Sequence, residues 1–282
     1  TEISNREKLI NLLSSDLNFH NQKSEFLSHN YHSFPAKFPP QLPRKFILEL
    51  IQKNDVILDP MMGSGTTILE GFLLGRKAIG FDIDPLAVLI LRVKTLPMNL
   101  KTVARQARSI LKEAKEKIES DVQKLEDLLH KRWDIKTKEF VDNWFSHKTQ
   151  LELIALQSAI ESFDDKAIKS FFKLMFSSLI ITKSGGVSFA LDLAHTRPHK
   201  AKIVYTSKGE KLLGQDLIGV HPPRLKLHTK TLRSVIDEFE KKCDQSLNSW
   251  REARLGKFKP VIDYGDAQNL PLNHQSVDLI VT

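Results

Sequence analysis

The chain has 282 residues, of which 41% are hydrophobic and 27% are charged, a composition typical of a water-soluble protein with a buried core. It has no apolar run near the ~20 residues that a membrane span requires and no N-terminal signal pattern, so we expect a cytoplasmic protein that meets no membrane. The single cysteine excludes an internal disulfide, and the formal net charge of +8 favours an acidic partner, with nucleic acid first.

The first hundred residues alternate short strands and helices. Apolar runs predict the strands, glycine ends one helix and proline opens another. In chain order we predict a helix at 6–13, an irregular proline-rich segment at 31–43, a helix at 46–52, a strand at 56–58, a helix at 66–74, a strand at 77–83 and a helix from Pro85. This order is typical of a parallel sheet with right-handed crossovers.

The alternation then stops for about 160 residues, longer than any ordinary loop. Two long helices, with apolar stripes over 107–129 and 232–250, predict an antiparallel helical hairpin that projects from the sheet. Residues 150–181 predict two further helices with a dense apolar face, and 203–205 a short strand. The sheet resumes with apolar strands at 261–264 and 277–281.

The strongest chemical signal follows the first strand, in the sequence DPMMGSGTT at 59–67. Gly63 and Gly65 allow a tight bend and close approach of the backbone to a ligand. Asp82 ends the second strand, 19 residues after Gly63, near the spacing expected of a carboxylate that binds a ribose. Open α/β sheets bind ligands at the carboxyl ends of their strands, so these residues predict a nucleoside-containing ligand.

A dinucleotide site is the competing interpretation. It usually has a third glycine three residues after the second, and here that position is Ile68. Asp59 and Pro60 precede the loop, and an acid at this point suits a ligand with an amino group better than a pyrophosphate. S-adenosylmethionine offers an ammonium, a carboxylate and a ribose.

These motifs resemble a known family. The segment HSFPAKFPP at 32–40, the loop at 59–67 and GFDIDP at 80–85 look like the opening of bacterial and archaeal DNA methyltransferases that modify the exocyclic amino group of cytosine or adenine. The resemblance implies a Rossmann-like class I methyltransferase sheet of α/β class, partial here, with a large mainly helical insertion between its second and third strands. It also implies S-adenosylmethionine as cofactor.

The family's binding roles carry over to matching positions. The proline-rich segment would line the cofactor pocket, the loop would hold the methionine part, Asp82 the ribose, and an acid after the third strand the adenine amino group. The positions expected to bind the cofactor are Phe38, Asp59, Pro60, Gly63, Ser64, Gly65, Thr66, Asp82 and Asp266.

The family's catalytic motif, Ser-Pro-Pro-Tyr or Asp-Pro-Pro-Tyr, directly follows the fourth strand. That strand here ends at Thr282, so we expect the motif just after Thr282 and assign no catalytic residue within the chain. A flipped-out base has to be stacked and its amine held in line with the methyl group. We therefore expect the chain to be a fragment that is inactive alone.

The region from Lys183 to Arg233 holds ten lysines and arginines against three acids, an excess of +7. Such a cluster is typical of phosphate binding, and in similar enzymes an insertion at this place carries the target-recognition region. The residues expected to contact DNA are Arg197, His199, Lys200, Lys202, Arg224 and Lys226. The histidines lack metal-ligand spacing, and no metal site is expected.

We therefore predict three parts: residues 1–98, the N-terminal segment and first half of the cofactor domain; 99–256, the insertion; and 257–282, the resumed sheet. The favoured function is site-specific methylation of cytosine or adenine in DNA, in restriction-modification with a possible cognate endonuclease or in a solitary system. An RNA methyltransferase and a non-catalytic nucleic-acid-binding module remain the alternatives.

Overall fold

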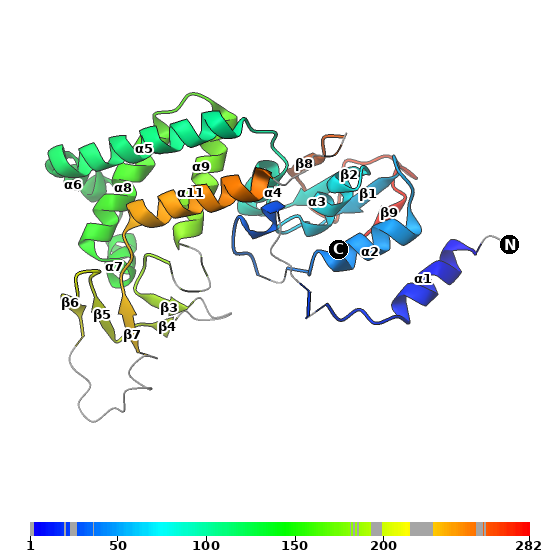
Figure 1. Cartoon of the computed structure of the whole chain (residues 1–282), viewed down its shortest axis with the longest axis horizontal. Helices are drawn as coiled ribbons and strands as arrows, with labels where there is room; N and C mark the ends of the chain where they lie inside the picture. The colour runs from blue at the N-terminus through cyan, green and yellow to red at the C-terminus, as the bar shows by residue number, and fades with distance from the viewer. Residues whose placement is uncertain are drawn as a thin grey trace. The chain divides into compact units, whose positions relative to one another are not determined.

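The computed structural model describes residues 3–19, 21–22, 27–35, 37–180, 182, 184, 186–192, 199–214, 228–251, 256 and 258–282. The chain divides into two compact units, residues 1–97 with 249–282, and residues 98–248. The elements of each unit are labelled in Figure 1. None of the described helices is long and apolar enough to cross a membrane.

The first unit is built on a four-stranded parallel sheet. Its strands are β1 (Val56–Asp59), β2 (Lys77–Asp82), β8 (Val261–Tyr264) and β9 (Leu279–Ile280), in the order β8-β2-β1-β9. All three pairings are parallel, and Asp59 lies opposite Gly80 while Asp82 lies opposite Tyr264. The carboxyl ends of β1, β2 and β8 therefore share one edge of the sheet, as predicted for an α/β fold.

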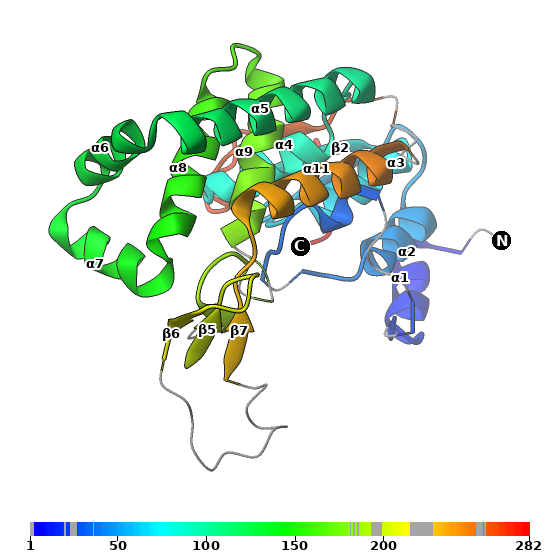
Figure 2. The same ribbon diagram turned by 60° about the vertical axis from the view of Figure 1, so that its left-hand side comes forward.

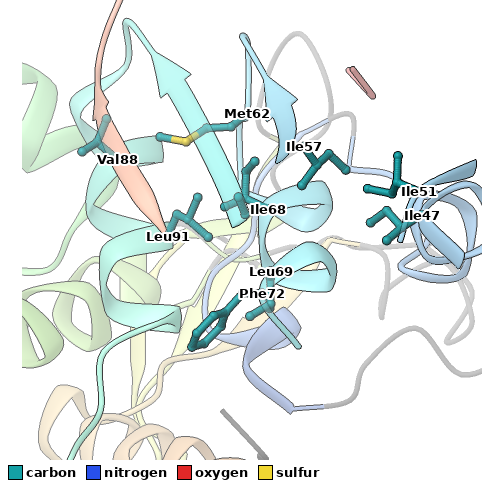
Figure 3. Close-up of a cluster of buried hydrophobic side chains, with 10 residues drawn as sticks. Ile47, Ile51, Ile57, Met62, Ile68, Leu69, Phe72, Val88 and Leu91 are labelled. Atoms are coloured by element: carbon teal, nitrogen blue, oxygen red, sulfur yellow. The ribbon is translucent and has the colours of Figure 1, made fainter. Parts of the chain in front are cut away.

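Short helices pack on this sheet or on one another. They are α1 (Asn5–Leu13), the 3₁₀ helix η1 (Leu27–Asn30), α2 (Gln41–Leu50), α3 (Thr66–Leu73) and α4 (Pro85–Lys94). Helix α3 packs on β1 and β2, α2 packs on α3, and α4 packs on β2 and β8. Their apolar faces meet the strands in one core, and Figure 3 shows side chains that include Ile57, Met62, Ile68 and Leu91 converging there.

The start of α2 differs from the prediction. The proline-rich segment was expected to remain irregular to residue 43, but the helix begins at Gln41, with Pro40 as N-cap and Pro43 in the first turn. The first N–H groups of a helix have no partner within it, so a proline there loses no hydrogen bond. Proline content alone therefore placed the boundary five residues too late.

The second unit contains helices, which Figure 2 labels, and two small sheets. Its helices are α5 (Leu100–Ser120), α6 (Val122–Arg132), α7 (Ile135–Trp144), α8 (His147–Glu161), α9 (Lys166–Ile180) and α11 (Val235–Arg251), whose last three residues belong to the first unit. Its strands are β3 (Ala190–Asp192), β4 (His199–Lys200), β5 (Ile203–Tyr205), β6 (Lys211–Leu213) and β7 (Thr229–Thr231). β3 pairs with β4, and the other three form a sheet in the order β6-β5-β7.

The predicted helical hairpin is wrong in its first arm, and the pairing of that arm with the second stays a prediction. The first arm, expected as one helix over 107–129, is broken at Asp121 into α5 and α6, which both pack on α8. The stripe is packing surface, with Ala107, Leu111 and Ala114 buried. Two phenylalanines of α9, Phe171 and Phe172, are also core, because both are fully buried and lie edge to face.

Candidate functional site

The loop between β1 and α3 makes a tight bend that requires glycine at two positions. Gly65 caps α3 with φ at +75°, and its carbonyl accepts a hydrogen bond from Leu69 N. Gly63 has φ at +49°. These left-handed values strain any residue with a Cβ atom. At Gly65 a Cβ would also lie 2.4 Å from Leu91 Cδ1, so there is no room for one.

Asp82, at the end of β2, holds this loop in place. Its Oδ2 accepts a hydrogen bond from Gly63 N at 2.7 Å, and its Oδ1 accepts one from Asp84 N at 2.9 Å. Next to this contact, Met62 N donates to Phe81 O at 2.9 Å. The glycine loop and the acid of the next strand, which were predicted to bind one ligand, are therefore in direct contact. A carboxylate offers about four lone-pair positions, so Asp82 retains capacity for further donors.

Asp59 lies at the end of β1, where only 3% of its surface is exposed. Burial raises the pKa of its carboxyl to about 6, whereas hydrogen bonds from Thr282 and from the backbone N–H of Met61 lower this pKa. Asp82 raises the pKa further because it is a second negative charge nearby. The contact with Thr282 also shows that the carboxyl end of β9 reaches this edge of the sheet. A buried carboxyl with a raised pKa would be stabilised by a cationic ligand.

The predicted acid after the third strand lies at the same edge. Gly265 N donates to Asp82 O at 3.2 Å, which brings the end of β8 beside the end of β2. Asp266 follows, is exposed, and accepts a hydrogen bond from Gln268 N at 2.9 Å. The structure therefore brings Asp59, Asp82 and Asp266 to three neighbouring strand ends, with the glycine loop between the first two.

An aromatic residue outside the predicted set touches the loop. A Cβ at Gly63 would lie 3.1 Å from Phe34 Cε1, and all three nearest atoms belong to this ring. Phe38, which the resemblance selected, is partly buried, and its role stays a prediction. Phe34 belongs to the same proline-rich motif, so the motif was the right signal although the sequence could not tell which ring faces the glycine.

Ser64 and Thr66 were predicted to bind the ligand, and both are buried, with their hydroxyl oxygens 3.4 Å apart. Pro60 is partly buried. Because the hydroxyls of Ser64 and Thr66 face each other within the protein, a ligand at this loop would meet mainly backbone. The carbonyl of Ser64 is itself bound from behind, by Lys94 Nζ at 2.7 Å.

The predicted DNA contacts are described only in part, because Arg197, Arg224 and Lys226 lie outside the described residues. His199 Nδ1 lies 2.9 Å from Asp192 Oδ1, and Lys200 Nζ donates to Asn143 Oδ1 at 2.6 Å. Lys202 is exposed. The assignment of these residues to DNA stays a prediction.

We expect Asp59→Asn to raise the free energy of unfolding at pH 7 by roughly 1–3 kcal/mol, since one pKa unit corresponds to 1.36 kcal/mol. The folded pKa of about 6 lies above the usual value, so between about pH 4 and 6 the folded protein binds more protons than the unfolded chain. The contribution of Asp59 to stability therefore decreases as the pH rises through this window. Urea unfolding at several pH values measures it.

The difference in the free energy of unfolding between Asp59→Asn and the unsubstituted protein should accordingly grow from about pH 4 to about pH 6.5 and then remain constant. Asp266→Asn, which removes an exposed carboxylate at a neighbouring strand end, is the matched control for the loss of a negative charge at this edge. A pH-independent difference for Asp59→Asn would contradict the buried-carboxyl interpretation.

Comparison with known proteins gives consistent similarities. Residues 6–92 match the sequence model of the N6/N4 methyltransferase family, described as DNA methylase. The chain is 29% identical over 215 residues to the type II methyltransferase M.MvaI of Kocuria varians, covering 75% of this chain and 46% of that protein. It is 42% identical over 66 residues to the type II methyltransferase M.MjaII of Methanocaldococcus jannaschii, covering 23% of this chain and 12% of that protein.

A third relative is the orphan methyltransferase M.BamHII of Bacillus amyloliquefaciens, 45% identical over 49 residues, which cover 17% of this chain and 18% of that protein. The chain spans less than half the length of each of these relatives. No solved structure matches the chain significantly.

Proposed function

We propose that this chain is the cofactor-binding part of a site-specific DNA methyltransferase. The proposal starts from the match of residues 6–92 to the N6/N4 DNA methylase family. The reaction would move a methyl group from S-adenosylmethionine to the exocyclic amino group of cytosine or adenine. The observation that carries the proposal is the hydrogen bond between Gly63 N and Asp82 Oδ2. It joins the glycine loop after β1 to a carboxylate at the end of β2, where α/β folds bind the ribose of a nucleotide.

The residues present fit this cofactor chemically. At Gly63 and Gly65 the left-handed backbone carries no side chain, so a ligand can approach the backbone of this loop closely. Asp59 would gain from a cationic ammonium, Asp82 has lone pairs left for two ribose hydroxyls, and exposed Asp266 offers an acceptor for an adenine amino group. S-adenosylmethionine supplies an activated methyl group when bound. The residues of this chain bind and orient it.

The groups that hold the target base stay a prediction. β9 ends beside Asp59, so a Pro-Pro-Tyr-type motif that follows this strand would begin at the ligand edge. There it would lie beside the methyl donor, which is where an in-line transfer needs the amine nitrogen.

We further propose that the second unit carries the target-recognition region. The +7 excess between Lys183 and Arg233 supports this, because cationic side chains bind phosphates independently of sequence. A cognate restriction endonuclease is a possible partner of the whole protein, and the similarity to an orphan methyltransferase is equally compatible with a solitary enzyme.

We expect the 282-residue chain to bind S-adenosylhomocysteine in the micromolar range, typical of enzyme ligands, and NAD not at all. Isothermal titration calorimetry measures both. The natural protein that contains this chain should then transfer tritiated methyl groups to duplex DNA, with RNA of the same sequence as control. Binding of NAD in place of S-adenosylhomocysteine would restore the dinucleotide interpretation, and methylation of RNA alone would overturn the DNA assignment.

A further inference from the structure

A fully buried lysine lies directly behind the glycine loop. Lys94 is the last residue of α4, and none of its surface is exposed. Its Nζ donates a hydrogen bond of 2.7 Å to the carbonyl oxygen of Ser64, the residue between the two loop glycines. The sequence did not predict this contact, because a lysine at the end of a helix usually extends into water.

Burying this amine is costly. Among the described carboxylates, none forms an ion pair with Lys94. Burial, helped by nearby Lys37, holds the pKa of Lys94 well below its usual range. A methionine of similar length would fill the same space without this cost. The amine is therefore more easily understood as a hydrogen-bond donor to the loop than as packing.

The loop is thus held at adjacent residues from two elements. Asp82 accepts from Gly63 N at the end of β2, and Lys94 donates to Ser64 O from α4. Glycine-containing loops lose much conformational entropy when they become ordered. A loop that is already held in its binding conformation loses less conformational entropy when the ligand binds.

We propose that Lys94 is a positioning residue that pre-organises the glycine loop for the amino-acid portion of the methyl donor. This inference rests on the proposed function. It assigns a role in binding to a residue that is shielded from solvent and would touch no ligand, since it acts through the carbonyl of Ser64.

A purely structural role is the competing explanation, because Lys94 also belongs to a buried polar network. Ser28 Oγ donates to the backbone carbonyl of Lys94 at 3.2 Å, and Lys37 Nζ donates to His29 O at 2.7 Å. Glu70, fully buried, lies 2.8 Å from His29 Nε2. Ser28→Ala is therefore a matched control, because it removes a buried hydrogen bond to the same residue and leaves the contact with Ser64 in place.

The test compares two ligands by calorimetry on the 282-residue chain. Lys94→Met should lower the affinity for S-adenosylhomocysteine about fivefold, the effect of about one hydrogen bond. The affinity for adenosine, which lacks the amino-acid portion, should change less than twofold. Ser28→Ala should change neither affinity more than twofold. Should the methionine variant not fold, Lys94→Gln takes its place with the same expected selectivity, because its amide nitrogen is one bond nearer the backbone and no longer reaches the carbonyl of Ser64.

Equal weakening of both ligands, or unchanged affinity in a folded Lys94 variant, would overturn the positioning role and leave the proposed function intact. A chain that binds S-adenosylhomocysteine neither with Lys94 nor without it would instead reject the proposed function, and the role of Lys94 with it. The two failures are therefore distinguishable from the same titrations.

Discussion

Replacing Gly65 with alanine is expected to lower the free energy of unfolding by roughly 2–5 kcal/mol and to abolish binding of S-adenosylhomocysteine. The left-handed backbone costs about 1–2 kcal/mol for a residue with a Cβ atom, and overpacking of a buried site adds about 1–3 kcal/mol. The overlap is severe, since the Cβ would lie 2.4 Å from Leu91 Cδ1, and Leu91 is fully buried. Urea denaturation measures the loss of stability.

Gly75 provides a matched control for the backbone contribution. It has the same φ, +75°, but a Cβ there would meet nothing within 4 Å. Gly75→Ala should therefore cost only about 1–2 kcal/mol. The difference between the two variants isolates the overlap with Leu91. If Gly65→Ala and Gly75→Ala lost the same stability, the loop would have room for a side chain beside Leu91. Glycine at position 65 would then not be required by packing.

A second substitution tests the same contact from the other side. Leu91→Ala alone leaves a cavity, but in combination with Gly65→Ala it makes space for the new methyl group. The two losses should therefore sum to more than the loss of the double variant, because residues in contact are energetically coupled. If the stability losses of the two single variants instead added up to the loss of the double variant, the strain caused by Gly65→Ala would not arise at Leu91.

The sheet and its loop were predictable because their signals are local. β1, β2 and β8 fall within one residue of the predicted runs, and α3 ends one residue before the predicted boundary. The spacing of Gly63 and Asp82 predicted that both residues bind one ligand; the structure brings them into direct hydrogen-bond contact, and their roles toward a ligand stay predictions. The family resemblance drawn from these motifs is confirmed by the match of residues 6–92.

Residues that act through tertiary contacts were not predictable. Nothing in the sequence around Lys94 distinguishes it from a solvent-exposed helix end, because its burial depends on residues about 30 and 66 positions away. The same holds for Phe34, whose position against Gly63 depends on how the proline-rich segment folds back. Local patterns identify which residue types can form a site, whereas packing decides which of them do.

The charge count illustrates the same limit in the second unit. The ten cations between Lys183 and Arg233 were counted as one surface, yet Lys230 is 8% exposed and donates to the carbonyl of Ala190. Arg233 forms an ion pair with Glu238 at 3.2 Å. A formal charge therefore overstates the cationic surface that is available to phosphates. Exposed residues such as Lys202 are the first candidates for DNA contacts.

Asp82→Ala is expected to weaken the binding of S-adenosylhomocysteine at least tenfold. The substitution removes the acceptor of Gly63 N, the acceptor of Asp84 N and the carboxylate proposed to bind the ribose. Hydrogen bonds to a charged group contribute about 1.5–3 kcal/mol each, and tenfold corresponds to about 1.4 kcal/mol. Calorimetry on the folded chain measures the change. Asp84→Ala, which removes the N-cap of α4 but leaves the loop contact, is the control and should have a much smaller effect.

The ribose contact and the loop contact of Asp82 can be separated with a 2′-deoxy analogue of S-adenosylhomocysteine. If the carboxylate accepts from the ribose, the analogue already lacks part of what Asp82→Ala removes, so the variant should lose less affinity for the analogue than for the parent ligand. If Asp82 only holds the loop, both ligands should lose affinity by the same factor. That outcome would retain Asp82 as a loop anchor, remove it from the ligand-binding surface and leave the ribose to another acceptor. Unchanged affinity for the parent ligand would remove the carboxylate from the site altogether, and with it the pairing of glycine loop and acid on which the methyl-donor assignment depends.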